Sequence, residues 1–431
     1  MQSVTKLLLI VSFLLLTSCF IGPVRDLKDQ IEESWENEDV PLNPTNLNKS
    51  VPLEIFDSLW NIDLGGEIDE NIQFSLCGNK LFAANNRGYI FVINYENGKV
   101  LYKKELNENI TAGITCSANN FYFVTNDGFA WALTANGDVL WKSFIGAVLT
   151  SPLVHETSVI FKTINNQFYS LDVKNGFKQW TYQASSPPLV IESWGSLSHF
   201  DGILYAGLPQ GKCLALNIKN GSLIWEATYS QPKGATDIER ASDTTSQPLS
   251  DEHFIYVVSS KGNIAALDNK NGNQVWSKNL SSFLGLTLFD NTIIVFHNSG
   301  AIYSIEKESG KVVWRNPEYI NRDITKGKIF TSKLIISDYE GYLHFIDLIS
   351  GKTISRLKPT SSKIIYHHAY NDKIFYAEKS GNLEMIKIND YAEFSYLTPT
   401  KKELQISADE IIDDENQKNK KSFIDELIFW D

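Results

Sequence analysis

Histidine is the side chain of this sequence best suited to acid–base catalysis or metal binding, and seven histidines are scattered along the chain. Two of them, His367 and His368, are adjacent, but neighbouring residues of a β-strand point to opposite faces of the sheet. Such a pair does not suit a simple metal site, which needs converging ligands. The sequence contains no H-E-x-x-H, G-x-S-x-G or phosphate-binding G-x-x-x-x-G-K-[ST] motif. The residues therefore predict no enzyme, no bound cofactor and no metal.

Lipid attachment is a second kind of chemistry, and Cys19 is the candidate for it. The chain begins with an early Lys6, an apolar run Leu7–Leu16, and then small residues before the cysteine. This is typical of a secretory signal, and the run is short for a membrane span of ~20 apolar residues. The segment L-T-S-C resembles the bacterial lipobox, which implies that Cys19 is lipidated, and Phe20 after it favours the outer over the inner membrane. An ordinary signal peptide with a chance cysteine is the alternative.

The three other cysteines, Cys77, Cys116 and Cys213, are far apart in the sequence and form no C-x-x-C pair. Each lies in an apolar stretch that is typical of a strand. A free cysteine behaves as a small apolar residue. We expect three buried, unpaired cysteines, with a disulfide as the alternative.

Charge and composition restrict the class of partner. The 431 residues carry a formal net charge of −12 and are 12% aromatic. A nucleic-acid partner would require a basic surface, which this balance argues against. After residue 18 the apolar runs are short, which indicates a β-rich chain outside the membrane.

A phrase of the form N-G-x-x-x-W recurs along the chain and indicates repeats. It follows an earlier turn that usually contains glycine, ten residues later in most units and nine in the second. That turn lies at Gly88, Gly128, Asn166, Gly211, Gly262, Gly300, Gly341 and Gly381. The successive spacings are 40, 38, 45, 51, 38, 41 and 40 residues. The sequence therefore contains eight units of about forty residues.

Each unit reads as four short strands joined by tight turns. Residues 80–106 show a strand, a turn at Gly88, a strand, a turn at Asn97-Gly98 and a third strand, and residues 111–119 supply the first strand of the next unit. Eight such units predict an all-β, eight-bladed β-propeller of four-stranded blades. The aromatic residue after each second turn is large and rigid enough to fill the space between blades. These residues are Tyr102, Trp141, Trp180, Trp225, Trp276 and Trp314, with Ser355 in the seventh unit.

The eighth unit lacks its outer strand signal, because Tyr391 and Ser395 replace the glycine and the tryptophan. Residues 56–66 have the opposite defect: they resemble an outer strand, with Trp60, but no hairpin precedes them. We therefore predict that the strand around Trp60 closes the ring by completing the last blade. The run F-S-Y-L at 394–397 competes for that place.

These patterns divide the chain into four parts. Residues 1–18 are the signal peptide, and 19–50, which are polar and acidic, are predicted to be a flexible tether from Cys19. Residues 51–398 form the propeller. Residues 399–431 are an acidic tail that we expect to be largely disordered.

The two longest spacings mark long connections, within residues 183–202 and 230–248. Each runs from the outer strand of one blade to the inner strand of the next. Such connections emerge on one face of a propeller, so these two should be neighbours there. Insertions gathered on one face of a repeat protein often form its binding surface, and the alternative is two tolerated loops without a function.

The repeat resembles two groups of proteins. One is the quinoprotein-type propellers, which implies a periplasmic dehydrogenase or ligand-binding propeller, although the chain lacks the adjacent cysteine pair of many of them. The lipobox, eight blades and long connections resemble more closely the BamB family, the lipoproteins of the outer-membrane β-barrel assembly machinery. Residues 230–243 are similar to that family's segment S-Q-x-x-G-x-T-E-I-x-R-x-S-D, and 337–352 to its seventh-blade hairpin.

The BamB resemblance implies a non-enzymatic scaffold that binds a periplasmic domain of BamA, works beside other assembly lipoproteins and is held by Cys19 in the outer membrane of a Gram-negative bacterium. Unfolded client chains are a further partner class. The implied partner-binding residues are Leu189, Ile191 and Glu192 in the first connection and Arg240, Asp243 and Thr245 in the second. Glu192 replaces the family's arginine and Thr245 its second aspartate.

Overall fold

The structure is a computed structural model, and it describes residues 43–48, 51–52, 56–68, 74–118, 120–185, 195–231, 244, 246–330 and 332–389. All of them belong to one compact unit, Pro41–Asp431. The predicted signal peptide and acidic tail lie outside the described residues. The described part of the chain contains no helix, and thus none that could cross a membrane.

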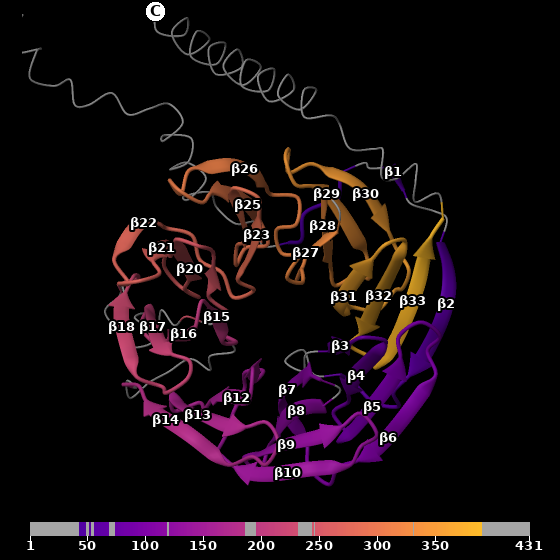
Figure 1. Ribbon diagram of the computed structural model, residues 1–431. Helices are drawn as coiled ribbons and strands as arrows, with labels where there is room; N and C mark the ends of the chain where they lie inside the picture. Colours follow the sequence, from indigo (N-terminus) through magenta and orange to yellow (C-terminus); the bar gives the residue numbers. More distant parts are fainter. Residues whose placement is uncertain are drawn as a thin grey trace, which may run out of the picture. The chain divides into compact units, whose positions relative to one another are not determined.

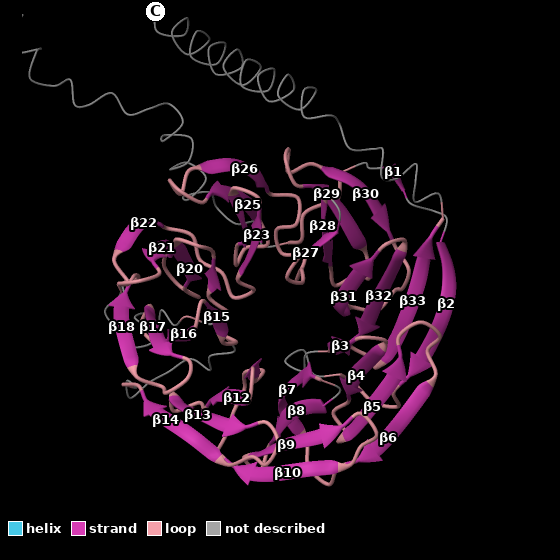
Figure 2. Ribbon diagram, viewed as in Figure 1, coloured by secondary structure: helices cyan, strands magenta, loops and turns pink. Residues whose placement is uncertain are grey.

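Eight sheets are arranged around a central axis, as predicted (Figure 1, Figure 2). Blade 1 contains β3 (Ser75–Cys77), β4 (Lys80–Ala84), β5 (Tyr89–Asn94) and β6 (Val100–Glu105), and blade 2 contains β7 (Ile110–Ser117), β8 (Asn120–Thr125), β9 (Phe129–Thr134) and β10 (Val139–Phe144). Blade 3 contains β11 (Leu153–His155), β12 (Ser158–Lys162), β13 (Gln167–Asp172) and β14 (Lys178–Gln183), and blade 4 contains β15 (Ser198–Phe200), β16 (Ile203–Leu208), β17 (Lys212–Asn217) and β18 (Leu223–Thr228).

Blades 5 to 8 continue around the ring. Blade 5 contains β19 (Leu249–Ser250), β20 (Phe254–Val258), β21 (Ile264–Asp268) and β22 (Gln274–Lys278), and blade 6 contains β23 (Leu286–Phe289), β24 (Thr292–Phe296), β25 (Ile302–Glu306) and β26 (Val312–Asn316). Blade 7 contains β27 (Lys328–Phe330), β28 (Lys333–Ser337), β29 (Leu343–Asp347) and β30 (Thr353–Leu357), with β1 (Val51–Pro52) as a fifth strand. Blade 8 contains β31 (Ile364–Tyr370), β32 (Lys373–Glu378), β33 (Asn382–Ile388) and β2 (Phe56–Asp63).

Burial follows the position of a strand in its blade. The two middle strands, such as β4 and β5, are buried over nearly their whole length, because neighbouring blades cover both faces. The outer strand is mostly exposed or half-buried in six of the blades, β26 and β30 being the exceptions, and in β10 the only buried side chain is Trp141. The sequence shows this difference as continuous apolar runs followed by a polar strand with one aromatic residue.

The recurring glycine and tryptophan contact each other across the space between blades. Gly272 in blade 5 has a φ of +75°, and a Cβ placed on it would lie 2.7 Å from Cε3 of Trp225 in blade 4. The indole N–H of Trp225 donates to the carbonyl oxygen of Asn269 at 3.0 Å. The same contact pairs Trp60 with Gly98, Tyr102 with Gly137, Trp141 with Gly176, Trp180 with Gly221, Trp276 with Gly310, and Trp314 with Gly351. The predicted wedge role of the aromatic residues is confirmed, and the glycine makes room for the ring of the preceding blade.

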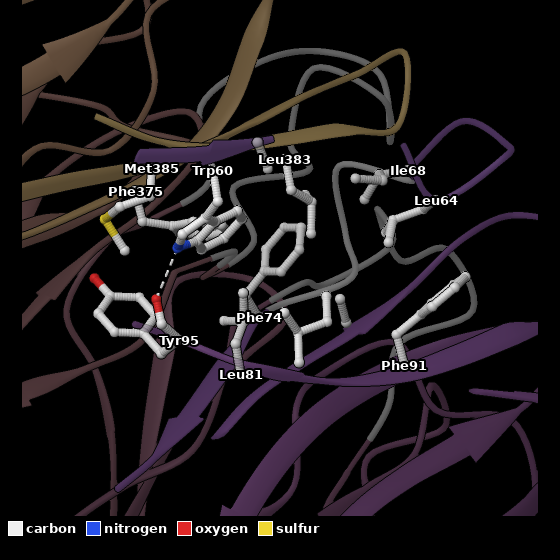
Figure 3. Close-up of a cluster of buried hydrophobic side chains, with 13 residues drawn as sticks. Trp60, Leu64, Ile68, Phe74, Leu81, Phe91, Tyr95, Phe375, Leu383 and Met385 are labelled. Carbon is white, nitrogen blue, oxygen red and sulfur yellow. Dashed lines mark hydrogen bonds between the residues drawn. The ribbon is translucent and has the colours of Figure 1, made fainter. Parts of the chain in front are cut away.

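The ring closes as predicted through β2. This strand pairs with β33 in antiparallel register, with Trp60 opposite Met385. Trp60 packs between blades 8 and 1 in a cluster with Phe74, Phe375 and other apolar side chains (Figure 3). The competing run at 394–397 lies outside the described residues.

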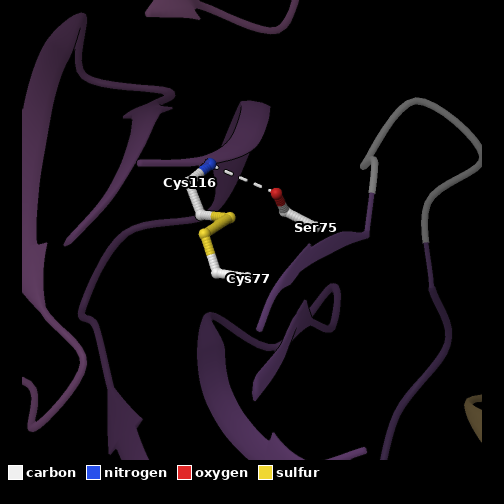
Figure 4. The surroundings of a disulfide bond; sticks show 3 residues. All are labelled: Ser75, Cys77 and Cys116. Atoms are coloured by element: carbon white, nitrogen blue, oxygen red, sulfur yellow. Dashed lines mark hydrogen bonds between the residues drawn. A yellow bond between two sulfur atoms is a disulfide. The ribbon is translucent and has the colours of Figure 1, made fainter. Parts of the chain in front are cut away.

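One prediction about the cysteines is wrong. Cys77 on β3 and Cys116 on β7 form a disulfide that joins the inner strands of blades 1 and 2, with a Cα–Cα distance of 6.1 Å (Figure 4). The hydroxyl of Ser75 accepts a hydrogen bond from the Cys116 amide at 3.1 Å beside it. The two cysteines are 39 residues apart, about one repeat, so they occupy neighbouring positions on adjacent blades. Cys213 is free and buried, as expected, and burial raises the pKa of its thiol.

Residues 43–48 also differ from the prediction. They fall within the predicted flexible tether, yet the amide of Thr45 donates to the carbonyl of Ile320 at 3.1 Å, between blades 6 and 7. The tether prediction does not hold for these six residues.

Candidate partner-binding face

One face of the ring carries the connections between blades. The strands alternate in direction, so this face also carries the turn between the two middle strands of each blade. Hydrogen bonds join the two kinds of segment: Leu106 N donates to Gly88 O at 2.8 Å, and Tyr229 N to Gly211 O at 2.9 Å. We call this side the connection face.

The first long connection runs from β14 to β15, and its described ends are attached to the ring. Ala184 is buried, and its amide donates to Asn166 O at 3.1 Å. At the other end Leu197 is buried in the cluster between blades 3 and 4. Both described ends of this connection are therefore attached to the ring.

The second long connection runs from β18 to β19 and is anchored by Thr244. This side chain is buried, its hydroxyl lies 2.6 Å from the Tyr229 hydroxyl, and it donates to Lys212 O at 3.1 Å. A Cβ on Gly207 would lie 2.3 Å from the Thr244 methyl carbon, so the glycine makes room for the anchor. The threonine ties the connection to blade 4.

The two long connections are joined to each other. The side-chain amide of Gln247, at the end of the second, donates to Leu197 O, at the end of the first, at 2.9 Å. The prediction that the two connections are neighbours on one face is confirmed for these described ends. Sequence reasoning missed Thr244 and Gln247, although their position near the end of a long connection was a signal that could have found them.

The predicted partner-binding residues lie outside the described residues, as does Cys19. They are Leu189, Ile191, Glu192, Arg240, Asp243 and Thr245. Asp243 and Thr245 directly flank Thr244 in the sequence.

Exposed apolar side chains lie on the described part of the connection face. Phe144, at the end of β10, is 66% exposed, and Ile164 in the next blade is also exposed. Phe283, between blades 5 and 6, is exposed on the other flank of the long connections. Such side chains suit contact with a protein surface better than chemistry.

The adjacent histidines face different blades, as predicted. His367 is buried, and its Nε2 donates to Ile335 O of blade 7 at 2.9 Å. The ring of His368 lies edge-on to that of Tyr95 of blade 1, with a centroid distance of 6.4 Å. Among the described residues, no group of three or more His, Cys, Asp or Glu side chains could hold a metal ion.

Burial of His367 predicts a pH-dependent stability. Burial, with the nearby charge of Lys328, lowers the pKa of His367 to about 3. Between pH ~6.5 and about pH 3, His367 binds a proton in the unfolded chain but stays neutral in the folded chain. The free energy of unfolding should therefore fall as the pH is lowered through this window, by at most ~1.4 kcal/mol per pH unit from this group.

Urea unfolding between about pH 7 and 4 measures this slope. His367→Gln keeps an N–H donor and removes the titrating group, so its slope should be shallower than that of the native chain. His253→Gln, at an exposed position, is the control and should leave the slope unchanged. Equal slopes for the native chain and His367→Gln would contradict the prediction.

Comparison with known sequences places these features in a family. The family model described as outer membrane protein assembly factor BamB matches residues 57–147 and 86–316, more than half of the chain. The chain is 27% identical over 372 residues to the outer membrane protein assembly factor BamB of Shewanella oneidensis, covering 82% of this chain and 94% of that protein. It is 26% identical over 334 residues to that of Escherichia coli, covering 74% and 84%.

Solved structures show the same fold. The crystal structure of BamB from Moraxella catarrhalis matches with a TM-score of 0.70 at 20% identity, over 77% of this chain and 100% of that chain. A quinohemoprotein alcohol dehydrogenase from Pseudomonas putida matches with a TM-score of 0.63 at 9% identity, over 82% and 79%. At these identities both likenesses concern the propeller fold alone. Since the family model covers most of the propeller, the chain belongs to the family of outer membrane protein assembly factor BamB.

Proposed function

We propose that this chain is a non-enzymatic scaffold in outer-membrane protein assembly, which binds a periplasmic domain of BamA through its two long connections. Membership of the BamB family supports the role in assembly. The choice of this face rests on the hydrogen bond between the Gln247 side chain and the Leu197 carbonyl, which joins the described ends of the two connections.

The mechanism we propose is the presentation of a preorganised surface. Anchors such as Thr244 attach the ends of the connections to the closely packed ring. The connections therefore lose less conformational freedom when a partner binds. Leu189 and Ile191 would supply the apolar contacts, and Glu192, Arg240, Asp243 and Thr245 the polar ones. Charges at such a rim contribute mainly to specificity and association rate.

The site of action we propose is the periplasmic side of the outer membrane of a Gram-negative bacterium, with Cys19 as the lipid anchor. The disulfide between Cys77 and Cys116 supports a compartment outside the cytoplasm, since disulfides persist in oxidising environments such as the periplasm. Other assembly lipoproteins and unfolded client chains are the further partners proposed.

A pull-down against the periplasmic domains of BamA from the same organism tests the proposal. The native chain should capture them, and the triple variant Leu189→Ala, Ile191→Ala, Asp243→Ala should lose at least about tenfold in affinity. A tenfold loss corresponds to about 1.4 kcal/mol, and truncating a central residue of an interface can cost more than about 1 kcal/mol. Phe177→Ala is the matched control, because Phe177 is 73% exposed in the turn between β13 and β14, on the opposite face.

Three results would be informative. No capture by the native chain would contradict the proposed function. Capture that the triple variant leaves unchanged would keep the function and contradict the proposed face. A quinone cofactor that changes its absorbance on binding the chain with calcium would contradict the non-enzymatic role.

A further inference from the structure

Blade 7 is completed differently from the other blades. At Ser355 the outer strand lacks the tryptophan, and β1 pairs with this strand in parallel, with Val51 opposite Ser355 and Pro52 opposite Arg356. Residues 43–48 lie just before this strand in the sequence. We call residues 43–48 together with β1 the strap.

The strap is bound mainly through its backbone. Besides its bond to Ile320, Thr45 accepts a hydrogen bond at its carbonyl from Arg322 Nη1 at 3.1 Å. The amide of Asn48 donates to Glu318 Oε1 at 2.6 Å, and its carbonyl accepts from Arg356 Nη1. Two arginines and one glutamate of the ring thus hold both ends of residues 45–48.

Two side chains of the strap add further contacts. The hydroxyl of Thr45 donates to Glu318 O at 2.5 Å. Leu47 is half-buried against the apolar cluster between blades 6 and 7, which includes Trp314 and Tyr319. Asn46, between them, is exposed. This alternation is that of an extended segment with one face on the ring.

The groups that hold the strap are themselves fixed in place. Arg322 donates twice to Asp338 Oδ2, at 2.9 and 2.7 Å, and His344 Nε2 lies 3.0 Å from the same oxygen. Arg356 donates through Nε to His344 Nδ1 at 3.1 Å and is paired with Glu318. These side chains are buried, and buried charges are tolerated only when paired and hydrogen-bonded.

The electrostatics of this network agree with its geometry. Burial by itself raises the pKa of Asp338, but His344 and Arg322 outweigh it and lower the pKa below its ordinary value. Burial lowers the pKa of His344, which keeps the imidazole neutral, as its two hydrogen bonds require. Paired and buried side chains of the ring therefore hold an extended backbone at the seam between blades 6 and 7.

We propose that the strap docks the N-terminal tether at this seam, so that the chain leaves the propeller at one fixed point beside blade 7 and the ring takes a preferred orientation to the membrane. This inference rests on the proposed lipid anchor. With the strap docked, residues 19–42 connect Cys19 to the ring, and without it residues 19–55 do. At about 3.4 Å per residue, docking shortens the maximum reach from about 125 Å to about 80 Å.

Hydrogen exchange in the full chain tests the docking. Leu47→Asp places a charge against the apolar cluster, so the amides of Thr45 and Asn48 should exchange at least about tenfold faster than in the native chain. Asn46→Asp adds the same charge at the exposed neighbour and should change neither amide. Since both substitutions lie outside the blades, the thermal unfolding of the ring serves as a check that it is intact. Fast exchange of both amides in the native chain would overturn the proposal.

Fluorescence quenching tests the orientation. The lipidated chain is bound to phosphatidylethanolamine–phosphatidylglycerol vesicles that carry a headgroup quencher, with a label at Ile349→Cys on blade 7 or at Leu223→Cys on blade 4. Both positions are exposed. We expect stronger quenching at 349 than at 223, and a smaller difference when Leu47→Asp is added.

The outcomes separate this inference from the proposed function. Equal quenching at both labels, or a difference that Leu47→Asp leaves unchanged, overturns the proposed orientation. A lipidated native chain that fails to bind vesicles contradicts the lipid anchor, and the orientation with it, while hydrogen exchange still decides whether the strap is docked.

Discussion

We expect Trp60→Ala to lower the free energy of unfolding by about 3–5 kcal/mol, the usual range for removing a buried tryptophan. Trp60 is 8% exposed, packs on Phe375 with a ring-centroid distance of 5.9 Å, and donates its indole N–H to Tyr95 O at 3.0 Å. It also fills the space left by Gly98. The substitution therefore removes contacts to blades 8 and 1 at once, at the place where the ring closes.

Urea unfolding measures the effect, with Leu59→Ala as the matched control. Leu59 precedes Trp60 on the same strand but is exposed, so its truncation should cost less than about 0.5 kcal/mol. Limited proteolysis should in addition cut Trp60→Ala within residues 56–63 faster than the native chain, because the closing strand has lost its anchor. Equal stabilities of the two variants would contradict the role of Trp60 in closure.

The disulfide should contribute a similar amount. Cross-linking Cys77 to Cys116 closes a loop with a sequence separation of 39, for which the chain-entropy relation gives about 4 kcal/mol. We expect the double variant Cys77→Ser, Cys116→Ser to lose about 2–4 kcal/mol in thiol-free buffer. The bond joins the inner strands of the first two blades, next to the closure of the ring.

Reduction provides the control for the disulfide. A thiol reductant should lower the stability of the native chain towards that of the double variant and leave the double variant unchanged. The variants Cys77→Ser and Cys116→Ser should each lose nearly as much as the double variant, because either one removes the whole bond. A native chain whose unfolding is insensitive to reduction would contradict the prediction.

The propeller could be predicted because its signals are local and repeated. A turn residue such as Gly272 and an aromatic residue such as Trp276 lie within a few positions of each other, and hairpins pair neighbouring strands. The closing strand was recognisable because a lone outer strand at Trp60 matched a last blade without one. The reason for the glycine was not local: Gly272 faces Trp225 of the preceding blade, 47 residues earlier.

The disulfide and the strap were missed for a common reason. Each depends on groups that are distant in the sequence, such as Thr45 and Ile320, or Cys77 and Cys116, and no local pattern relates them. The spacing of one repeat between the two cysteines was a usable signal once the repeat was known. Residues 43–48 gave no such signal in the sequence, because the ring binds mainly their backbone and any residue type has the same backbone groups.

The sequence by itself determined the class of fold, the number of blades, the closing strand and the face with the long connections, because these follow from short-range patterns repeated eight times. It also indicated the candidate residues of that face, from Leu189 to Thr245. Only the tertiary structure decided which charges are buried together at Arg322 and Arg356, which cysteines pair and where the N-terminal segment docks. Those outcomes depend on which side chains the closed ring brings within hydrogen-bonding distance, and the ring sets these distances only when all eight blades are in place.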